Sequence, residues 1–152
     1  MHTFTAEPAL TDAQQQSLRC IVAHMIPANA RYGVPGADDD MIFADIVSSL
    51  DRETAAVRQA VALLDGIAGG ALSASSTERQ QSILREFRRQ QPALTAALTA
   101  ATVRCYYRDD RVMRSLGMEP RPPFPKGFDV AQGDWSLLEP VRARGKIYRE
   151  AP

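Results

Sequence analysis

Four prolines lie within six residues of this chain, at positions 120, 122, 123 and 125. Proline lacks a backbone N–H and disfavours helical backbone at the residue before it, so this segment excludes a helix and favours extended or polyproline-like backbone. The chain therefore divides into a part of about 10–117, which must supply the core, and a C-terminal arm of about 118–152. Because 152 residues is an ordinary domain length, we expect both parts to form one domain.

Apolar residues recur at helical spacing before the prolines. Leu18, Ile21, Val22 and Met25 follow the i, i+3, i+4, i+7 pattern of an amphipathic helix. Similar patterns predict helices over about 40–50, 52–68, 76–87 and 92–107, with a short one at about 110–116. No stretch alternates with period two between hairpin turns. The sequence thus predicts an all-α fold, a small bundle of about five to six helices with a long, irregular C-terminal arm rich in proline and aromatic residues.

The predicted helix ends carry typical capping residues. Thr11 with Gln14 and Ser75 with Glu78 match the capping-box pattern. Asp51 is expected to cap the helix that precedes Gly69–Gly70, the glycines that end it. The run 38–40 consists of three aspartates, which suit a helix N-terminus better than a cation site because no calcium-loop spacing follows.

Composition excludes several classes of function. The chain has 18 basic and 18 acidic residues, so its net charge is zero and no basic excess indicates nucleic-acid binding. No window approaches 18 uninterrupted apolar residues, so we expect no direct membrane insertion. Cys20 and Cys105 have no metal-like spacing and lie within apolar helical patterns, which favours buried, reduced thiols, although a disulfide between their helices stays open.

The chain also lacks a recognisable catalytic motif. It has two histidines and none of the HExxH, CxxC, GxSxG or glycine-rich phosphate-loop patterns. We therefore predict no catalytic, cofactor-binding or metal-binding residue and no enzyme activity of the chain on its own. One alternative is a free-standing small helical enzyme that uses Tyr107, Asp109, Arg111 or His24. Another is a general α-helical protein-interaction module.

The arm concentrates the residue types that are enriched at protein interfaces. Exposed aromatic side chains are costly in water, so the arm must pack on its own bundle or on another protein. Prolines reduce the entropy that an extended segment loses on docking, and arginine forms forked hydrogen bonds to carboxylates. The expected partner-contacting residues are Tyr106, Tyr107, Arg121, Pro122, Pro123, Phe124, Pro125, Lys126, Phe128, Trp135, Leu138, Arg142, Arg144 and Tyr148.

Six segments together resemble the gluconate 2-dehydrogenase subunit 3 family, over about residues 10–149. They are LRCIVAHMIP (18–27), ALLDGIA (62–68), LSASSTERQQSIL (72–84), CYYRDDRVMRSLG (105–117), RPPFPKGF (121–128) and DWSLLEPVRARGKIYR (134–149). The resemblance implies a non-catalytic small subunit that binds and stabilises a large subunit of the glucose–methanol–choline oxidoreductase type. That partner would hold FAD and oxidise an alcohol or sugar, as a dehydrogenase or oxidase, and this chain would bind no cofactor itself.

Secreted members of that family carry a twin-arginine signal for both subunits. This sequence begins with MHTFTAEPALTDAQQQ, which has no basic region, apolar region or twin arginine. We therefore expect a cytoplasmic hetero-oligomer, or a periplasmic one if a leader has been removed. A role in folding and maturation of the partner remains the expectation.

Overall fold

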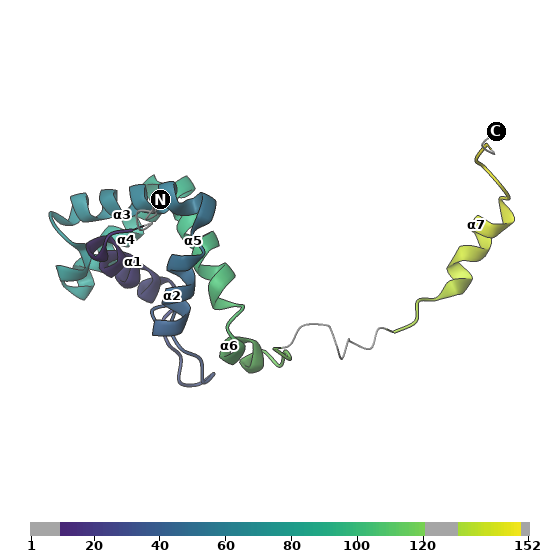
Figure 1. Ribbon diagram of the computed structural model, residues 1–152, viewed down its shortest axis with the longest axis horizontal. Coiled ribbons are helices and arrows are strands. Elements are labelled where there is room, and N and C mark those ends of the chain that lie inside the picture. The colour runs from purple at the N-terminus through teal and green to yellow at the C-terminus, as the bar shows by residue number, and fades with distance from the viewer. Residues whose placement is uncertain (1–9, 121–130, 150–152) are drawn as a thin grey trace, which may run out of the picture. The chain divides into compact units, whose positions relative to one another are not determined.

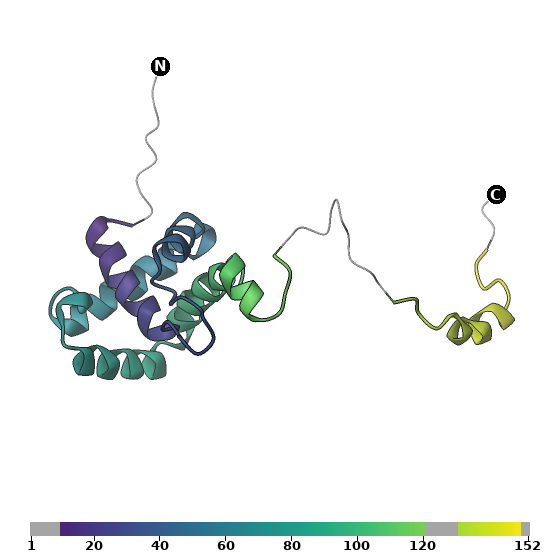
Figure 2. The same ribbon diagram turned by 90° about the horizontal axis from the view of Figure 1, so that it is seen from below.

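The computed structural model describes residues 10–120 and 131–149. The chain divides into two compact units, Met1–Pro120 and Arg121–Pro152. Each unit is described separately. Figures 1 and 2 show the helices of the first unit gathered into one bundle, as an all-α fold requires.

Six α-helices and two short 3-10 turns form the first unit. Within the described ranges there is no β-strand, and an isolated bridge between Asn29 and Val34 is confined to the loop after the first helix. The elements are α1 (Asp12–Met25), α2 (Asp40–Ser48), η1 (Asp51–Glu53), α3 (Thr54–Ala68), η2 (Leu72–Ala74), α4 (Thr77–Gln90), α5 (Pro92–Tyr106) and α6 (Asp110–Ser115). The prediction of an all-α bundle is confirmed.

Several helix ends are capped as the sequence predicts. Thr11 and Gln14 form the complete capping box of α1, and Asp39 caps α2 by accepting from the backbone N–H of Met41. Pro92 occupies the first turn of α5, where its missing N–H removes no helical hydrogen bond. Gly69 ends α3 with a φ of +77°, a left-handed conformation that glycine adopts without steric cost.

Two predicted caps are wrong. Asp51 begins the 3-10 turn η1 with a φ of +39°, and α3 starts after Glu53 with no side-chain cap. The turn satisfies the first N–H of the helix instead, because the Thr54 backbone N–H donates to the Asp51 carbonyl. Ser76 takes the place expected for Ser75 and caps α4 by accepting from the Arg79 N–H.

The core lies where α3 meets α1, α4 and α5, and α2 packs on α5. These contacts bury the apolar stripes that the periodicity predicts. On α3, the side chains of Val57, Ala60, Val61 and Leu64 are fully buried. The other buried apolar residues are Leu10, Leu18, Ile21, Val22, Ala37, Ile42, Phe43, Ile46, Leu50, Leu72, Ile83, Phe87, Leu98, Ala101, Cys105, Tyr106 and Val112.

One helical stretch, Asp51–Ala74, is long and apolar enough by composition to cross a membrane. Most of it is α3, which also carries Arg58 and Asp65. The Asp65 carboxylate accepts from the Ser17 hydroxyl and from the Leu72 N–H, both at 2.8 Å. The apolar stripe of α3 therefore packs against protein within this bundle, as the central helix of a helical bundle does.

Candidate interaction surface

The C-terminal unit contains a 3-10 turn, η3 (Trp135–Leu138), that continues into the short helix α7 (Glu139–Ala143). Asp134 starts the turn because its carboxylate accepts from the Ser136 N–H at 3.0 Å and the Ser136 hydroxyl at 2.6 Å. These bonds hold the pKa of Asp134 below its usual value. Pro140 occupies the first turn of α7, where proline is tolerated. The helix α7 was not predicted from the sequence, which indicated an irregular arm.

The described part of this unit, residues 131–149, has no buried side chain. Trp135 is 61% exposed, Leu138 40% and Tyr148 66%. The indole N–H of Trp135 donates to the Gln132 side chain at 3.0 Å, which fixes the polar edge and leaves the ring face uncovered. The full set of exposed large apolar residues here is Trp135, Leu137, Leu138, Val141, Ile147 and Tyr148. An apolar group of this size within a short segment is typical of a binding surface.

Basic side chains accompany these apolar residues. Arg142 and Arg144 are exposed and form no ion pair within residues 131–149. The Lys146 ammonium lies over the Tyr148 ring, 5.9 Å from its centroid. Arginines beside exposed aromatic groups are the combination enriched at interface hot spots. The structure therefore brings Trp135, Leu138 and these arginines into one short segment.

Half of the residues predicted to contact a partner fall outside the described ranges. They are Arg121, Pro122, Pro123, Phe124, Pro125, Lys126 and Phe128.

The tyrosine pair at the end of α5 is divided between core and surface. Tyr106 is 4% exposed, so the expectation of a partner-contacting position does not hold for it. Its hydroxyl donates to the Pro35 carbonyl at 3.1 Å, and burial raises its pKa. The neighbouring Tyr107 is 52% exposed and meets the Tyr106 ring edge to face at 5.3 Å. Helical periodicity explains the difference, because the side chains of two adjacent residues at the end of a helix point in directions about 100° apart.

Two of the four residues considered for catalysis, Asp109 and Arg111, belong to a structural ion-pair cluster, or arginine clamp. Asp109 caps α6 by accepting from the Arg111 N–H at 2.9 Å. The Arg111 guanidinium lies between two carboxylates, 2.7 Å from Asp39 and 2.9 Å from Asp109. It lowers the pKa of both aspartates, and they raise its own. A carboxylate held ionised by such a pair is poorly suited to act as a general acid.

A second clamp was missed by sequence reasoning. Arg108 lies two residues after the end of α5 and donates to both carboxylate oxygens of Asp45 on α2. Its guanidinium also lies 2.6 Å from the Ser49 hydroxyl oxygen. Arg104 donates to the Ser49 carbonyl at 2.8 Å and pairs with Glu53. The available signal was the i, i+4 spacing of Arg104, on α5, and Arg108, two residues after the end of that helix.

His24 has a structural partner. Its Nε2 lies 2.8 Å from Oε1 of Gln80, a residue that is 9% exposed. The Gln80 amide N–H₂ donates to the carbonyls of Leu72 and Ser75, at 3.3 and 2.8 Å, so its oxygen must accept and His24 Nε2 must carry the proton. His24 lines a groove between α1, α4 and α5, whereas Asp109 and Arg111 border a different hollow. The four residues of the alternative enzyme hypothesis therefore share no pocket.

Cysteines and metal ligands add no further site in the described ranges. Cys20 and Cys105 are free thiols, and burial raises the pKa of each. No group of three or more histidine, cysteine, aspartate or glutamate side chains there could hold a metal ion. The reactive thiolate form of each cysteine is thus disfavoured at neutral pH.

Comparison of the chain with models of protein families, with curated proteins and with solved structures finds no match.

Proposed function

We propose that this chain is a non-catalytic subunit that binds and stabilises a larger, FAD-containing oxidoreductase of the glucose–methanol–choline type. The partner would carry the flavin and oxidise an alcohol or sugar, and the two chains would form a hetero-oligomer. The resemblance of six segments to the gluconate 2-dehydrogenase subunit 3 family supports this class of partner. The chain itself would supply contacts and no chemistry.

The observation that carries a binding role is that the C-terminal unit does not bury its large apolar side chains within itself over residues 131–149. Six large apolar side chains are 40–87% exposed within residues 135–148, beside Arg142 and Arg144. Covering an exposed aromatic ring removes roughly 150–250 Å² from water, which makes such side chains strong anchors. This surface supports docking on an apolar partner surface that has carboxylates at its edge.

The paired state of the polar groups in the bundle also supports a non-catalytic role. Asp39, Asp45 and Asp109 each hold a guanidinium, and their pKa values are lowered. General acid–base catalysis needs a group whose pKa lies near the working pH. These aspartates instead join α2 to the end of α5 and to α6.

The proposed stabilisation works by mass action. A subunit that binds only the folded form of its partner increases the partner's free energy of unfolding by RT ln(1 + [L]/Kd), which is about 2.7 kcal/mol at a concentration of 100 Kd. The partner would then accumulate as folded, flavin-loaded protein. No rearrangement of the partner's active site is needed for this effect.

Co-expression tests the proposal. The flavoprotein of this type encoded nearest to the chain is expressed alone, with the intact chain, and with a Trp135→Ala/Leu138→Ala variant. We expect the intact chain to raise the yield of soluble, flavin-loaded flavoprotein several-fold and the variant to raise it much less. A Tyr32→Ala variant is the matched control, because Tyr32 is an aromatic residue of the first unit that is 63% exposed. Equal yields with and without the chain would reject the proposal.

A further inference from the structure

The groove between α1, α4 and α5 has a volume of about 880 Å³, which lies within the range of roughly 300–1,000 Å³ typical of small-molecule sites. Apolar side chains from all three helices form its floor. Ile21 of α1, Phe87 of α4 and Leu98 of α5 are buried there, and Met25, Ile26 and Leu84 are partly buried beside them. A ligand with an extended apolar part can therefore be sheltered from water.

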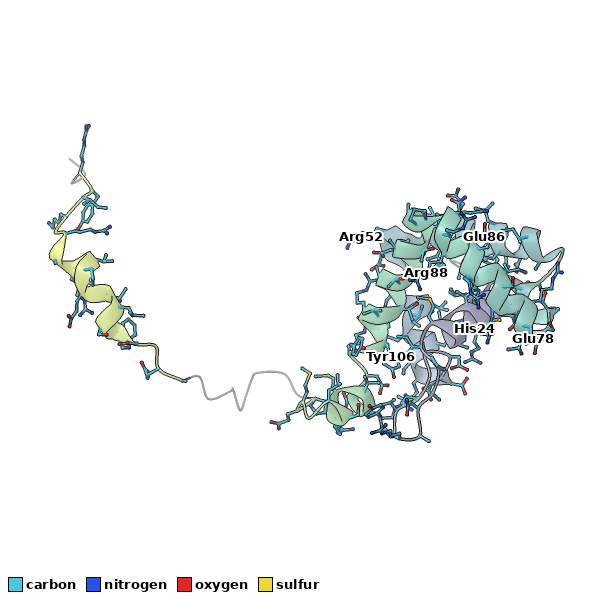
Figure 3. All side chains as sticks on the ribbon, turned by 180° about the vertical axis from the view of Figure 1, so that it is seen from behind. His24, Arg52, Glu78, Glu86, Arg88 and Tyr106 are labelled. Atoms are coloured by element: carbon cyan, nitrogen blue, oxygen red, sulfur yellow. The ribbon has the colours of Figure 1, made fainter. Side chains whose placement is uncertain are left out.

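The rim of this groove is cationic. Arg85, Arg88 and Arg89 of α4 are exposed at its edge, and Figure 3 shows Arg88 and His24 on neighbouring helices that both line it. No aspartate or glutamate is among the described residues that line the groove. The nearest carboxylate in sequence, Glu86, is already bound to Arg89 and Gln90. Glu86 thus neutralises Arg89, whereas no residue that lines the groove neutralises Arg85 or Arg88.

Arg85 and Arg88 differ from the other arginines of the bundle. Within the described chain, neither makes a hydrogen bond, an ion pair or a contact with an aromatic ring, whereas every other arginine from 10 to 120 does. They stand three residues apart on α4, so their side chains share one face of the helix. Two unpaired guanidinium groups over one apolar groove fit a ligand with an anionic head and an apolar tail.

We propose that this groove binds a single-chain anionic amphiphile, with the tail on the apolar floor and a carboxylate held by Arg85 and Arg88. A guanidinium matches a carboxylate with two parallel hydrogen bonds, so the head group is recognised by geometry as well as by charge. The basic stretch 142–149 of the chain is an unsuitable occupant, because Arg142, Arg144, Lys146 and Arg149 have the same sign as the rim. The proposal does not depend on the flavoprotein partner.

Titration calorimetry of the intact chain with dodecanoate, kept below its micelle-forming concentration, tests the site. We expect saturable binding of one dodecanoate per chain. Dodecyltrimethylammonium, which has the same tail and a cationic head, is expected to bind at least about tenfold more weakly, equivalent to about 1.4 kcal/mol. Absence of saturable dodecanoate binding, or equal affinity for the two head groups, would overturn the proposal.

Substitutions at the groove test whether dodecanoate binds there. Arg85→Glu/Arg88→Glu should weaken dodecanoate binding at least about tenfold. The matched control is Arg31→Glu/Arg114→Glu, which changes the net charge equally at residues outside the groove lining and should bind as the intact chain does. Thr99→Trp fills the groove from the exposed face of α5 and should abolish binding while circular dichroism and the unfolding temperature stay unchanged. Undiminished binding by the Arg85/Arg88 pair variant or by the Thr99 variant would show that the amphiphile lies elsewhere.

Discussion

Gln80 links three parts of the bundle through one side-chain amide. It lies on α4, donates to carbonyls of η2 and of the residue after it, and accepts from His24 at the end of α1. Because the side chain is buried, water cannot replace these hydrogen bonds if the amide is removed. The residue therefore has more effect on stability than its polar character suggests.

Gln80→Ala should lower the free energy of unfolding by about 2 kcal/mol, because it leaves buried polar groups without partners. Gln81→Ala is the matched control, since Gln81 follows directly on the same helix, is exposed and should change stability by less than about 0.5 kcal/mol. Urea unfolding followed by circular dichroism measures both values. Equal effects of the two substitutions would contradict the assigned hydrogen-bond network.

The arginine clamps predict the acid sensitivity of the bundle. Hydrogen bonds from Arg111 and Arg108 lower the folded-state pKa of Asp39, Asp109 and Asp45 below the ordinary value of 3.8. As pH falls through 3.8, these groups take up protons in the unfolded chain first, so protonation favours unfolding. The stabilisation is present above that pH and is lost as pH falls further, through the folded-state pKa values.

Urea unfolding across a series of pH values below 5 tests this expectation. The free energy of unfolding of the intact chain should fall steeply with acid, and the fall should be shallower in Arg108→Met/Arg111→Met, in which the aspartates lose their cations. At neutral pH, where the pairs are intact, this variant should be less stable by about 1–2 kcal/mol, a modest value because the pairs are partly exposed. The same acid dependence in both proteins would show that the clamps do not set it.

At the scale of elements, α3 shows how local chemistry determines where a helix runs and where it ends. Its buried stripe contacts α1, α4 and α5, and its C-terminus depends on the left-handed backbone of Gly69. Gly66, three residues earlier, lies inside the helix and has open space where a Cβ atom would stand. The two glycines therefore have opposite energetic roles.

Substituting each glycine by alanine separates these roles. Gly66→Ala should stabilise the protein by about 0.5–1 kcal/mol, because alanine favours helix and meets no neighbour. Gly69→Ala should destabilise it by about 1 kcal/mol, because a Cβ atom is unfavourable at a φ of +77°. Thermal unfolding of the two variants measures whether each substitution raises or lowers the stability of the protein. Changes of the same sign would contradict the assigned helix end.

Helical periodicity was sufficient to predict the all-α class and most elements, because the buried stripes are long and regular. Caps were less predictable: Ser75 and Ser76 are chemically equal, and only tertiary packing selects the second. The 3-10 turn at Asp51 begins at a φ of +39°, which is uncommon even for aspartate, although aspartate is enriched at positive φ among the non-glycine residues. The contacts of Arg108 with Asp45 join residues 63 positions apart, so only the folded chain reveals them. For the predicted partner surface, sequence did not distinguish exposed Tyr107 from buried Tyr106.

At the scale of the whole molecule, the two units present different chemistry. The first has a continuous core, arginine clamps and a groove with a cationic rim. The second, over residues 131–149, exposes its apolar side chains. In the proposed function the first unit supplies a stable scaffold and the second supplies contacts to a flavoprotein.

Affinity purification of the tagged chain from its native cells, followed by a visible absorbance spectrum and a native mass, tests the central claim most directly. We predict a larger protein that co-purifies in fixed stoichiometry and contributes a flavin spectrum. The Trp135→Ala/Leu138→Ala variant should lose both signals, whereas the Tyr32→Ala control should keep them. A chain that elutes alone, or with a partner that has no flavin, would contradict the account.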